Sequence, residues 1–512
     1  MAPQRTERVY VTTTIPYVNA APHLGFALEL IAADALARHQ RRRGVPARLS
    51  TGTDDNSLTN VLAAEAEGIP VSRLVDRNAD RFASLLAPLG IEADDFVRTS
   101  RDPRHSVAVD KLWRACQASG DLYRSRYEGL YCVRCERFMG PDELTDGLCP
   151  DHLLPPERVA EDNWFFRLSR YADTLARLIR GDRLRIVPDQ HAREVLSFLD
   201  AGLQDFSISR SQERARGWGM PVPDDPDQVV YVWFDALVNY LSALDYGTDG
   251  DLYSTWWVNA RDRIHLIGKN VIRFHAVYWP AMLLSAGEPL PTTIFVHQFL
   301  TLDGRKISKS LGNTIDAFSL VDRFGSDAVR WWLLREPSPT GDTDFTTERL
   351  TARANADLAN GIGNLVNRVV AMVHRYRAGR VPHSSRHDSI LQRTVRTLPG
   401  RVDAAMEQFD LREATSVVVA VADEANSLIN RSRPWELAAA GQAGDANAAA
   451  ALDDLLAQLV WASRALADEL VPFVPALAER VHRQLTGAVL PPARPAFQRL
   501  DVENRGPAPS RG

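Results

Sequence analysis

Three cysteines and one histidine have the spacing of a metal site. Cys132, Cys135, Cys149 and His152 form the pattern C-x2-C-x13-C-x2-H, in which each pair can bind one ion from a tight turn. Three thiolates and one imidazole suit tetrahedral Zn²⁺, and because they complete its coordination we expect a closed, structural site. The alternative is a remnant of such a site that no longer binds metal. Cys116 lies outside the pattern and is expected to be a buried apolar residue.

A second group of residues has the chemistry of a polyphosphate site. Nearly all of the 60 basic residues are arginine, yet Lys306 and Lys309 lie three apart in a loop flanked by glycines. Two ammonium groups placed in this way can bind phosphates whose negative charge grows in a transition state. Much earlier in the chain, His23 can donate to a phosphate, and Gly25 lets a flat base approach the backbone. The alternatives are an ordinary basic loop and a structural turn.

These residues follow predicted strands of an α/β sheet. The β-branched run at 9–14 predicts a buried strand, and helical spacing of apolar residues begins at Leu24. A second strand at 47–50 ends in the polar segment TGTDDN, which makes the opening a βαβ unit. Further strands are expected at 264–268 and 294–297. Ligands of parallel sheets bind at the carboxyl ends of such strands.

The composition is that of a globular protein of several domains. The chain has 512 residues, 45% of them hydrophobic and 24% charged, with a formal charge of −5. No apolar run reaches the roughly 18 residues that a membrane helix needs, and the first residues lack the apolar core of a signal peptide. We therefore expect a cytoplasmic protein without a membrane partner. In that reducing compartment, cysteines more often hold metal than form disulfides. Net acidity does not exclude a nucleic-acid partner, because local basic patches contact phosphates.

Motifs in the correct order carry a resemblance to a known family. Residues 16–26 resemble the His-x-Gly-His signature of class I aminoacyl-tRNA synthetases, and residues 306–310 resemble their Lys-Met-Ser-Lys-Ser signature. Residues 8–490 as a whole resemble the methionyl-tRNA synthetases of the bacterial single-zinc-knuckle type. That likeness also rests on the segments EGLYCVRCERF, YVWFDALVNYLSALDY and HLIGKNVIRFHAVYWPAML.

The resemblance implies a fold and a division of the chain. The fold class is α/β, with a Rossmann-like catalytic domain, a zinc-knuckle insertion and a helical-bundle anticodon-binding domain. The expected segments are 1–116 (first catalytic half), 117–222 (inserted connective domain with the knuckle), 223–300 (second catalytic half), 301–345 (lysine loop and stem-contact region), 346–500 (helical domain) and 501–512 (disordered tail). Within the helical domain, the alanine-rich residues 438–451 are expected to connect two helices.

The resemblance also implies a reaction and its site residues. The enzyme joins L-methionine to tRNA(Met), initiator and elongator, through methionyl-adenylate, using ATP with Mg²⁺ and one structural Zn²⁺. The catalytic residues implied are His23, Asp54, Arg210, Lys306 and Lys309; ATP is bound by His23, Gly25, Lys306, Ser308 and Lys309. The methionine site comprises Ile15, Tyr17, Asp54, Trp233, Ala236, Leu237, Tyr240, Val271, Phe274 and His275. For Trp233 and Tyr240, plain core packing is the alternative.

Residues of the helical region are implied to read the tRNA anticodon. Asn364 and Arg368 are four apart and therefore lie on one helical face, and Trp435 begins a later helix. The family's equivalents bind the CAU anticodon by hydrogen bonds and stacking. A solvated helix face followed by an ordinary helix start is the alternative. Some family members dimerise through an appended C-terminal tRNA-binding domain. We expect this domain to be absent here, and we therefore expect a monomer.

Five positions depart from the family pattern near the expected adenylate site. Phe26 stands where histidine is usual, Asn56 and Ser57 where the family has His-Gly, Asn270 where it has aspartate, and Gln298 where it has glycine. These changes raise two alternatives to methionine ligation. One is a divergent paralogue that adenylates another amino acid or differs in inhibitor sensitivity. The other is a non-catalytic tRNA-binding protein.

Overall fold

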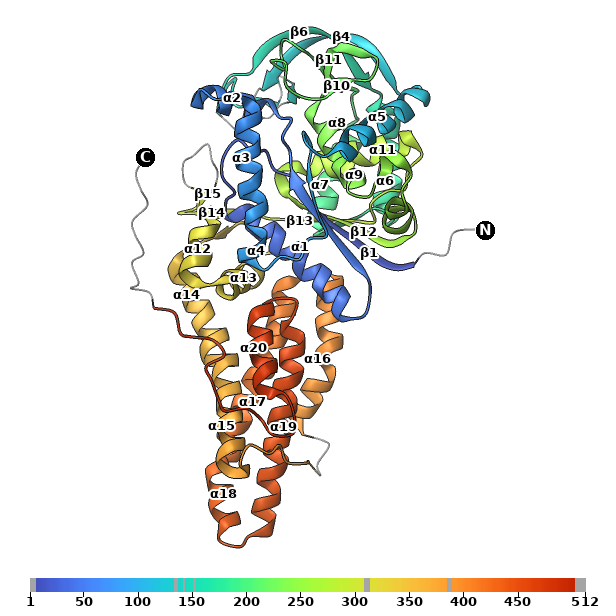
Figure 1. The fold of residues 1–512 in the computed structure, drawn as a ribbon. Coiled ribbons are helices and arrows are strands. Elements are labelled where there is room, and N and C mark those ends of the chain that lie inside the picture. Colours follow the sequence, from blue (N-terminus) through green and yellow to red (C-terminus); the bar gives the residue numbers. More distant parts are fainter. Residues whose placement is uncertain are drawn as a thin grey trace. The chain divides into compact units, whose positions relative to one another are not determined.

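The chain divides into two compact units (Figure 1). The computed structural model describes residues 6–132, 137–140, 143–150, 153–307, 314–384 and 389–501. Unit 1 comprises residues 1–87, 91–299 and 306–317, and unit 2 comprises 88–90, 300–305 and 318–512. The expected division into six segments stays a prediction, and residues 502–512 of the expected tail lie outside the described residues.

A parallel sheet of six strands forms the centre of unit 1. β1 lies in its interior, where Val11 pairs with Leu49 on one side and Ile264 on the other. The four strands predicted from apolar runs are confirmed as β1, β2, β12 and β13. The sheet order is β3 (Asp95–Arg98), β2 (Ala47–Thr53), β1 (Thr6–Thr13), β12 (Ala260–Gly268), β13 (Thr293–His297) and β7 (Arg185–Val187).

Polar side chains cap the N-termini of several helices of unit 1 by accepting hydrogen bonds from backbone N–H groups. Ser57 accepts from the N–H of Thr59 at the start of α2, and Asp102 accepts from that of Arg104 at the start of α5. The main helices of this unit are α1 (Leu24–Arg42), α2 (Leu58–Glu67), α3 (Val71–Ser84), α5 (Pro103–Ala118), α6 (Ala172–Arg180), α7 (Asp189–Asp200), α8 (Val232–Leu237), α9 (Asn239–Ser242) and α11 (Trp279–Ala286).

Two small antiparallel sheets occur between strands of the parallel sheet in the chain order, and all of their strands except β11 lie within the segment 117–222 predicted to be an insertion. The first has the order β5 (Arg137–Met139), β4 (Leu122–Cys132), β6 (Glu157–Phe166) and β8 (Phe206–Ser207). The second has the order β10 (Pro221–Val222), β11 (Asp225–Val230) and β9 (Ser209–Ser211).

Unit 2 is mainly helical, as the sequence predicts. Buried Arg330 links its segments, because the guanidinium donates to the carbonyl oxygens of Leu89, Pro472 and Phe473. A short sheet of β15 (Arg305–Lys306), β14 (Leu300–Leu302) and β16 (Thr343–Asp344) precedes the helices. The helices are α12 (Ala317–Phe324), α13 (Ser326–Arg335), α14 (Thr347–Ala354), α15 (Asn364–Arg377), α16 (Ile390–Glu407), α17 (Leu411–Ser432), α18 (Pro434–Gln442), α19 (Ala446–Leu470) and α20 (Pro475–Leu485).

The prediction that residues 438–451 connect two helices is wrong. α18 continues to Gln442 and α19 begins at Ala446, so the connection is only three residues long. Alanine is the strongest helix former, and the side chain of Asp445 caps α19 by accepting from the N–H groups of Asn447 and Ala448.

In the part of the chain that the structure describes, no helix has the length and apolar character required to cross a membrane.

Candidate active site

The turn between β1 and α1 lies beside the ends of two other chain segments. Asp54, immediately after β2, donates its backbone N–H to the carbonyl oxygen of Pro16 at 3.0 Å. On the other side of the turn, Leu24 donates to the carbonyl of Ile315, and His23 forms a backbone bridge with Asp316. Three segments that are distant in sequence therefore meet at one edge of the sheet.

His23 is oriented by the glycine that follows it. Its Nδ1 accepts a hydrogen bond from the backbone N–H of Gly25 at 3.1 Å, at the N-terminus of α1. A Cβ at position 25 would lie 2.9 Å from His23 Cε1, so a larger residue would require the His23 ring to move from this position. Because Nδ1 accepts, the proton of the neutral ring is on Nε2, which can donate to an anion at the helix N-terminus.

The lysine loop is described only at its two ends. The backbone of Lys306 belongs to β15, and Ile307 is buried. Ser308 and Lys309 lie outside the described residues. The chain is described again from residue 314, and the pairing of Ile315 and Asp316 brings this end of the loop to the turn that carries His23.

Phe26 belongs to the hydrophobic core. Its side chain is 6% exposed and packs edge to face against the buried ring of Phe82 on α3, with 5.1 Å between the ring centroids. The family pattern places a hydrogen-bonding histidine at this position. Here the side chain instead joins α1 to α3 by an apolar contact.

A buried polar network joins the end of β2 to α8. The backbone N–H of Asn56 donates to the carboxylate of Asp54, and its side-chain amide donates to Asp235 at 2.7 Å. His105 on α5 contacts the other oxygen of Asp235 at 2.7 Å, and its second ring nitrogen contacts Ser242 at 2.9 Å. Asp54, Asp235 and His105 are each at most 1% exposed. Sequence reasoning missed His105 and Asp235, since one acid and one histidine at distant positions have no recognisable spacing.

Aromatic side chains on α8 and the segment after β12 form an apolar wall. Trp233 stacks flat on Phe274, with ring centroids 3.7 Å apart and an angle of 4° between the planes. Tyr17 lies 6.4 Å from Trp233 between ring centroids. Of the other predicted methionine-site residues, Ala236 and Leu237 are buried on α8, Val271 follows β12, and Ile15 follows β1.

Tyr240 and His275 form a buried pair next to this wall. His275 Nδ1 donates to the carbonyl oxygen of Val271 at 2.9 Å, so Nε2 accepts from the Tyr240 hydroxyl at 2.7 Å. Burial lowers the pKa of His275 to about 4 and raises the pKa of Tyr240 well above its ordinary value. Both groups are therefore neutral near pH 7, which suits an apolar ligand.

Glu29 is a further polar residue that sequence reasoning missed. It is 4% exposed on α1, accepts from the backbone N–H and the hydroxyl of Thr14, and contacts His297 Nε2 at 2.9 Å. The carboxylate thereby ties the residues that follow β1 to the end of β13. The available signal was an acidic residue within the apolar stripe of a helix, between Leu28 and Leu30.

The remaining departures have identifiable contacts. Ser57 caps α2, and Gln298 donates its amide N–H to His191 Nε2 at 2.8 Å. Asn270 is exposed just after β12, and its Oδ1 lies where a side chain on Gly268 would otherwise fit. Each of these side chains is accommodated by its surroundings, so the departures do not disrupt the fold.

Arg210 is buried on β9. Its NH1 donates to the carbonyl oxygen of Ser209 at 2.6 Å and to the hydroxyl of Ser207 at 3.0 Å. Its guanidinium carbon lies 4.2 Å from the ring centroid of Tyr231. The arginine is thus held by residues of both small sheets, Ser207 of β8 and Ser209 of β9.

The structure describes two of the four predicted zinc ligands. Cys132 at the end of β4 and Cys149 are both buried in a small cluster with Met139. Cys135 and His152 lie outside the described residues. Among the residues that are described, no group of three or more possible metal ligands occurs. One cysteine from each predicted pair nevertheless lies in the same cluster, which fits the donor set of a zinc knuckle. Cys116, in contrast, is buried on α5, where burial raises the pKa of its thiol to about 12.

The predicted anticodon residues all belong to unit 2. Asn364 is exposed in the first turn of α15, and Arg368 one turn later donates to Asn430 on α17 at 3.1 Å. Trp435 is the second residue of α18, five residues after Asn430, and half of its side chain is exposed.

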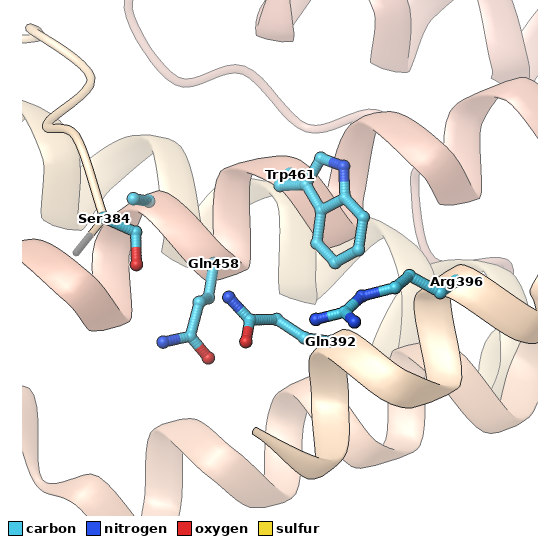
Figure 2. A pocket seen from close by; sticks show the side chains of 6 residues that line it. Ser384, Gln392, Arg396, Gln458 and Trp461 are labelled. Carbon is cyan, nitrogen blue, oxygen red and sulfur yellow. The ribbon is translucent and has the colours of Figure 1, made fainter. Parts of the chain in front are cut away.

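Unit 2 also contains a surface hollow of about 380 Å³ between α16 and α19. Figure 2 shows Gln392 and Arg396 on one helix and Gln458 and Trp461 on the other, lining this hollow. None of the predicted site residues lines it.

Comparison with known proteins decides the family. The model described as "tRNA synthetases class I (M)" matches residues 9–157 and 154–370. The chain is 40% identical to the methionine–tRNA ligase of Thermotoga maritima over 441 residues, which are 85% of this chain and 69% of the relative. It is 39% identical to that of Thermosynechococcus vestitus, over 93% of this chain and 89% of the relative.

The chain belongs to the class I tRNA synthetases. The fold agrees: Mycobacterium tuberculosis methionyl-tRNA synthetase in complex with methionyl-adenylate superimposes with a TM-score of 0.91 at 38% identity, covering 96% of this chain and 100% of that one. The fold class expected for the synthetase, α/β with a parallel sheet and a helical C-terminal region, is confirmed.

The contact of Phe26 with Phe82 predicts a large effect on stability. We expect Phe26→Ala to lower the free energy of unfolding of the synthetase by about 3 to 5 kcal/mol, because it removes a ring from a packed core. Phe26→Leu, the conservative control, is expected to cost about 1 kcal/mol. Urea unfolding measures both. A loss below about 1 kcal/mol for Phe26→Ala would show that the ring is not packed as described.

The buried, neutral His275 predicts a loss of stability in mild acid. Its pKa is about 4 when folded and near 6.5 when unfolded, so the unfolded chain binds the extra proton between these values. We expect the free energy of unfolding to fall as the pH drops from about 6.5 to about 4, by up to about 3 kcal/mol from this residue. Burial also lowers the pKa of His265, which contributes in the same direction.

Unfolding of His275→Gln measured across the same pH range checks this assignment. The variant should lose part of the pH dependence, whereas His383→Gln, at an exposed position, should keep it. An equal slope in wild type and His275→Gln would mean that folding does not lower the pKa of His275.

Proposed function

We propose that this synthetase is a methionine–tRNA ligase, which forms methionyl-adenylate and pyrophosphate from L-methionine and ATP and then transfers methionine to tRNA. The observation that carries the assignment is the match along 96% of the chain to a synthetase solved with methionyl-adenylate. Relatives at about 40% identity have the same activity in their names. These findings do not favour the paralogue for another amino acid or the non-catalytic RNA-binding protein.

The phosphates of ATP bind at the turn between β1 and α1. His23 presents Nε2–H and α1 its N-terminal N–H groups, and both favour an anion. Gly25 keeps this surface low enough for the nucleotide to approach. We assign Lys306, Ser308 and Lys309 to the same phosphates, since the far end of their loop pairs with this turn. Their positive charge would stabilise the transition state in which pyrophosphate leaves.

Methionine binds between a carboxylate and the apolar wall. Asp54 accepts the substrate ammonium, and Asn56 holds its carboxylate in place. Trp233 and Phe274 provide a flat apolar surface for the thioether side chain, and the neutral Tyr240–His275 pair closes the pocket without a charge. Ile15, Tyr17, Ala236, Leu237 and Val271 complete the proposed pocket.

Positioning rather than a covalent nucleophile accounts for the chemistry. A carboxylate oxygen of methionine attacks the α-phosphorus of ATP, the bond to the bridging oxygen breaks, and pyrophosphate leaves. The terminal ribose hydroxyl of the tRNA then attacks the carbonyl carbon, and AMP leaves. We assign Arg210 a supporting role beside the adenylate. Asn364, Arg368 and Trp435 bind the anticodon, where an exposed indole can stack on an unpaired base.

Two metal ions belong to the proposal. Mg²⁺ would neutralise part of the phosphate charge of bound ATP. Zn²⁺ would be held by Cys132, Cys135, Cys149 and His152 as a structural ion that stabilises the inserted segment. We further propose a monomer that acts in the cytoplasm on both initiator and elongator tRNA(Met). Gel filtration and charging of each tRNA from one preparation test these points.

Methionine-dependent exchange of pyrophosphate into ATP tests the proposed function. Wild type should exchange with methionine, and Asp54→Asn should lower the rate at least about 100-fold by removing the partner of the ammonium. Asp249→Asn, the same change at an exposed site, is the control and should match wild type. Exchange with an amino acid other than methionine would support the paralogue, and tRNA binding without any exchange would support the non-catalytic protein.

Metal analysis of two cysteine variants tests the zinc site. Wild type should contain about one zinc per chain, and Cys149→Ser should lose it because a hydroxyl replaces a thiolate ligand. Cys116→Ser is the matched control, since it changes a cysteine that is equally buried but outside the pattern, and it should keep the zinc. Full zinc content in Cys149→Ser would contradict the proposed ligand set.

A further inference from the structure

Arg368 on α15 is held by two neutral groups. Its NH1 donates to the side-chain oxygen of Asn426 at 3.4 Å and its NH2 donates to that of Asn430 at 3.1 Å. The two asparagines are four residues apart on α17 and therefore present their amides on one face of that helix. Within the described residues, no carboxylate lies within 4 Å of this guanidinium.

Three other arginines in this part of unit 2 are paired with acids. Arg377, on the same helix as Arg368, contacts Asp453 at 2.5 Å. Arg431 contacts Glu424 at 2.7 Å, and Arg433 contacts Glu436 at 3.1 Å. A carboxylate partner cancels the charge of an arginine, whereas an amide oxygen fixes its position and leaves the charge in place. Arg368 is thus held in position by partners that do not neutralise its positive charge.

The orientation of the Asn426 amide is also defined. Its Nδ2 donates to the carbonyl oxygen of Gly361 at 3.3 Å, on the segment that leads into α15. This bond turns Oδ1 toward Arg368, so the amide has one contact for its donor and one for its acceptor. Gly361 and Arg368 belong to consecutive helical segments, and Asn426 therefore joins both to α17.

We propose that Asn426 and Asn430 are positioning residues for tRNA recognition, which hold the cationic Arg368 guanidinium ready for the anticodon loop. The inference rests on the proposed function and extends it to two residues that would act through Arg368. An arginine with remaining N–H donors, one helical turn after exposed Asn364, has the chemistry that reads unpaired RNA bases, and half-exposed Trp435 follows Asn430 by five residues. The two neutral partners already restrict the side chain of Arg368 to few rotamers. The entropy that this side chain loses when RNA binds is therefore smaller.

An isosteric change of charge separates this role from simple packing. Asn430→Asp keeps the shape and the acceptor oxygen but places a carboxylate against Arg368. We expect the KM for tRNA in charging to rise roughly 10-fold or more, with kcat changed less than about two-fold. Asn430→Ala, which removes the acceptor without adding charge, should raise the KM only about two- to five-fold. Pyrophosphate exchange in the absence of tRNA should be unchanged in both variants.

A control and a second background make the test decisive. Gln408→Glu adds the same charge at an exposed residue, the C-cap of α16, three residues before α17 begins, and should leave the KM for tRNA within about two-fold of wild type. In an Arg368→Ala background, Asn430→Asp should change the KM less than about two-fold, because the residue that it positions is gone. Thermal unfolding of each variant verifies that unit 2 stays folded.

Two results would overturn the inference while leaving the proposed function intact. One is a normal KM for tRNA in Asn430→Asp. The other is an equal rise in the KM with and without Arg368, which would mean that the new charge repels the RNA directly. A wild type that neither exchanges with methionine nor charges tRNA would overturn the proposed function and this inference with it.

Discussion

The parallel pairing of β1 with β2 on one side and β12 on the other is the constraint on which unit 1 depends. Parallel strands all present their carboxyl ends at one edge, and the backbone groups beyond that edge have no ladder partners. Here they are satisfied by short-range contacts between distant segments. Asp54 donates to Pro16, Leu24 donates to Ile315, and Thr14 donates to Glu29. The candidate site is built on this edge for that reason.

At the same edge of the sheet, the candidate site has a part with buried carboxylates and a part lined by apolar side chains. The buried carboxylates are hydrogen-bonded. Burying a carboxylate is costly unless it is hydrogen-bonded. Asn56 meets this requirement for two acids at once, through its backbone N–H to Asp54 and its amide to Asp235. His105 completes the set around Asp235. The network fixes α8, which carries Trp233, in relation to the carboxylate proposed to bind the ammonium.

The departures from the family pattern have different physical consequences. Phe26 stands where the family pattern has a polar residue, and its ring contacts Phe82. This departure therefore adds an apolar contact to the core. Asn56 donates to an acid, and Ser57 caps the start of a helix. Gln298 makes a new contact with His191. A substitution near an active site can therefore be absorbed by its neighbours, and sequence comparison alone does not separate these cases.

The sequence by itself determined four of the six strands of the parallel sheet, the order of its motifs and the residue types of the candidate site, because local patterning and spacing are written along the chain. It also indicated the helical C-terminal region, although it misplaced the connection at 438–451, where alanine propensity and the Asp445 cap prolong the helices. Only the tertiary structure decided which polar groups meet. The contacts of Glu29 with His297, Asp235 with His105, and Arg368 with Asn430 each join side chains at least 62 residues apart. No periodicity or spacing predicts them, since they exist only after the sheet and the helices have packed.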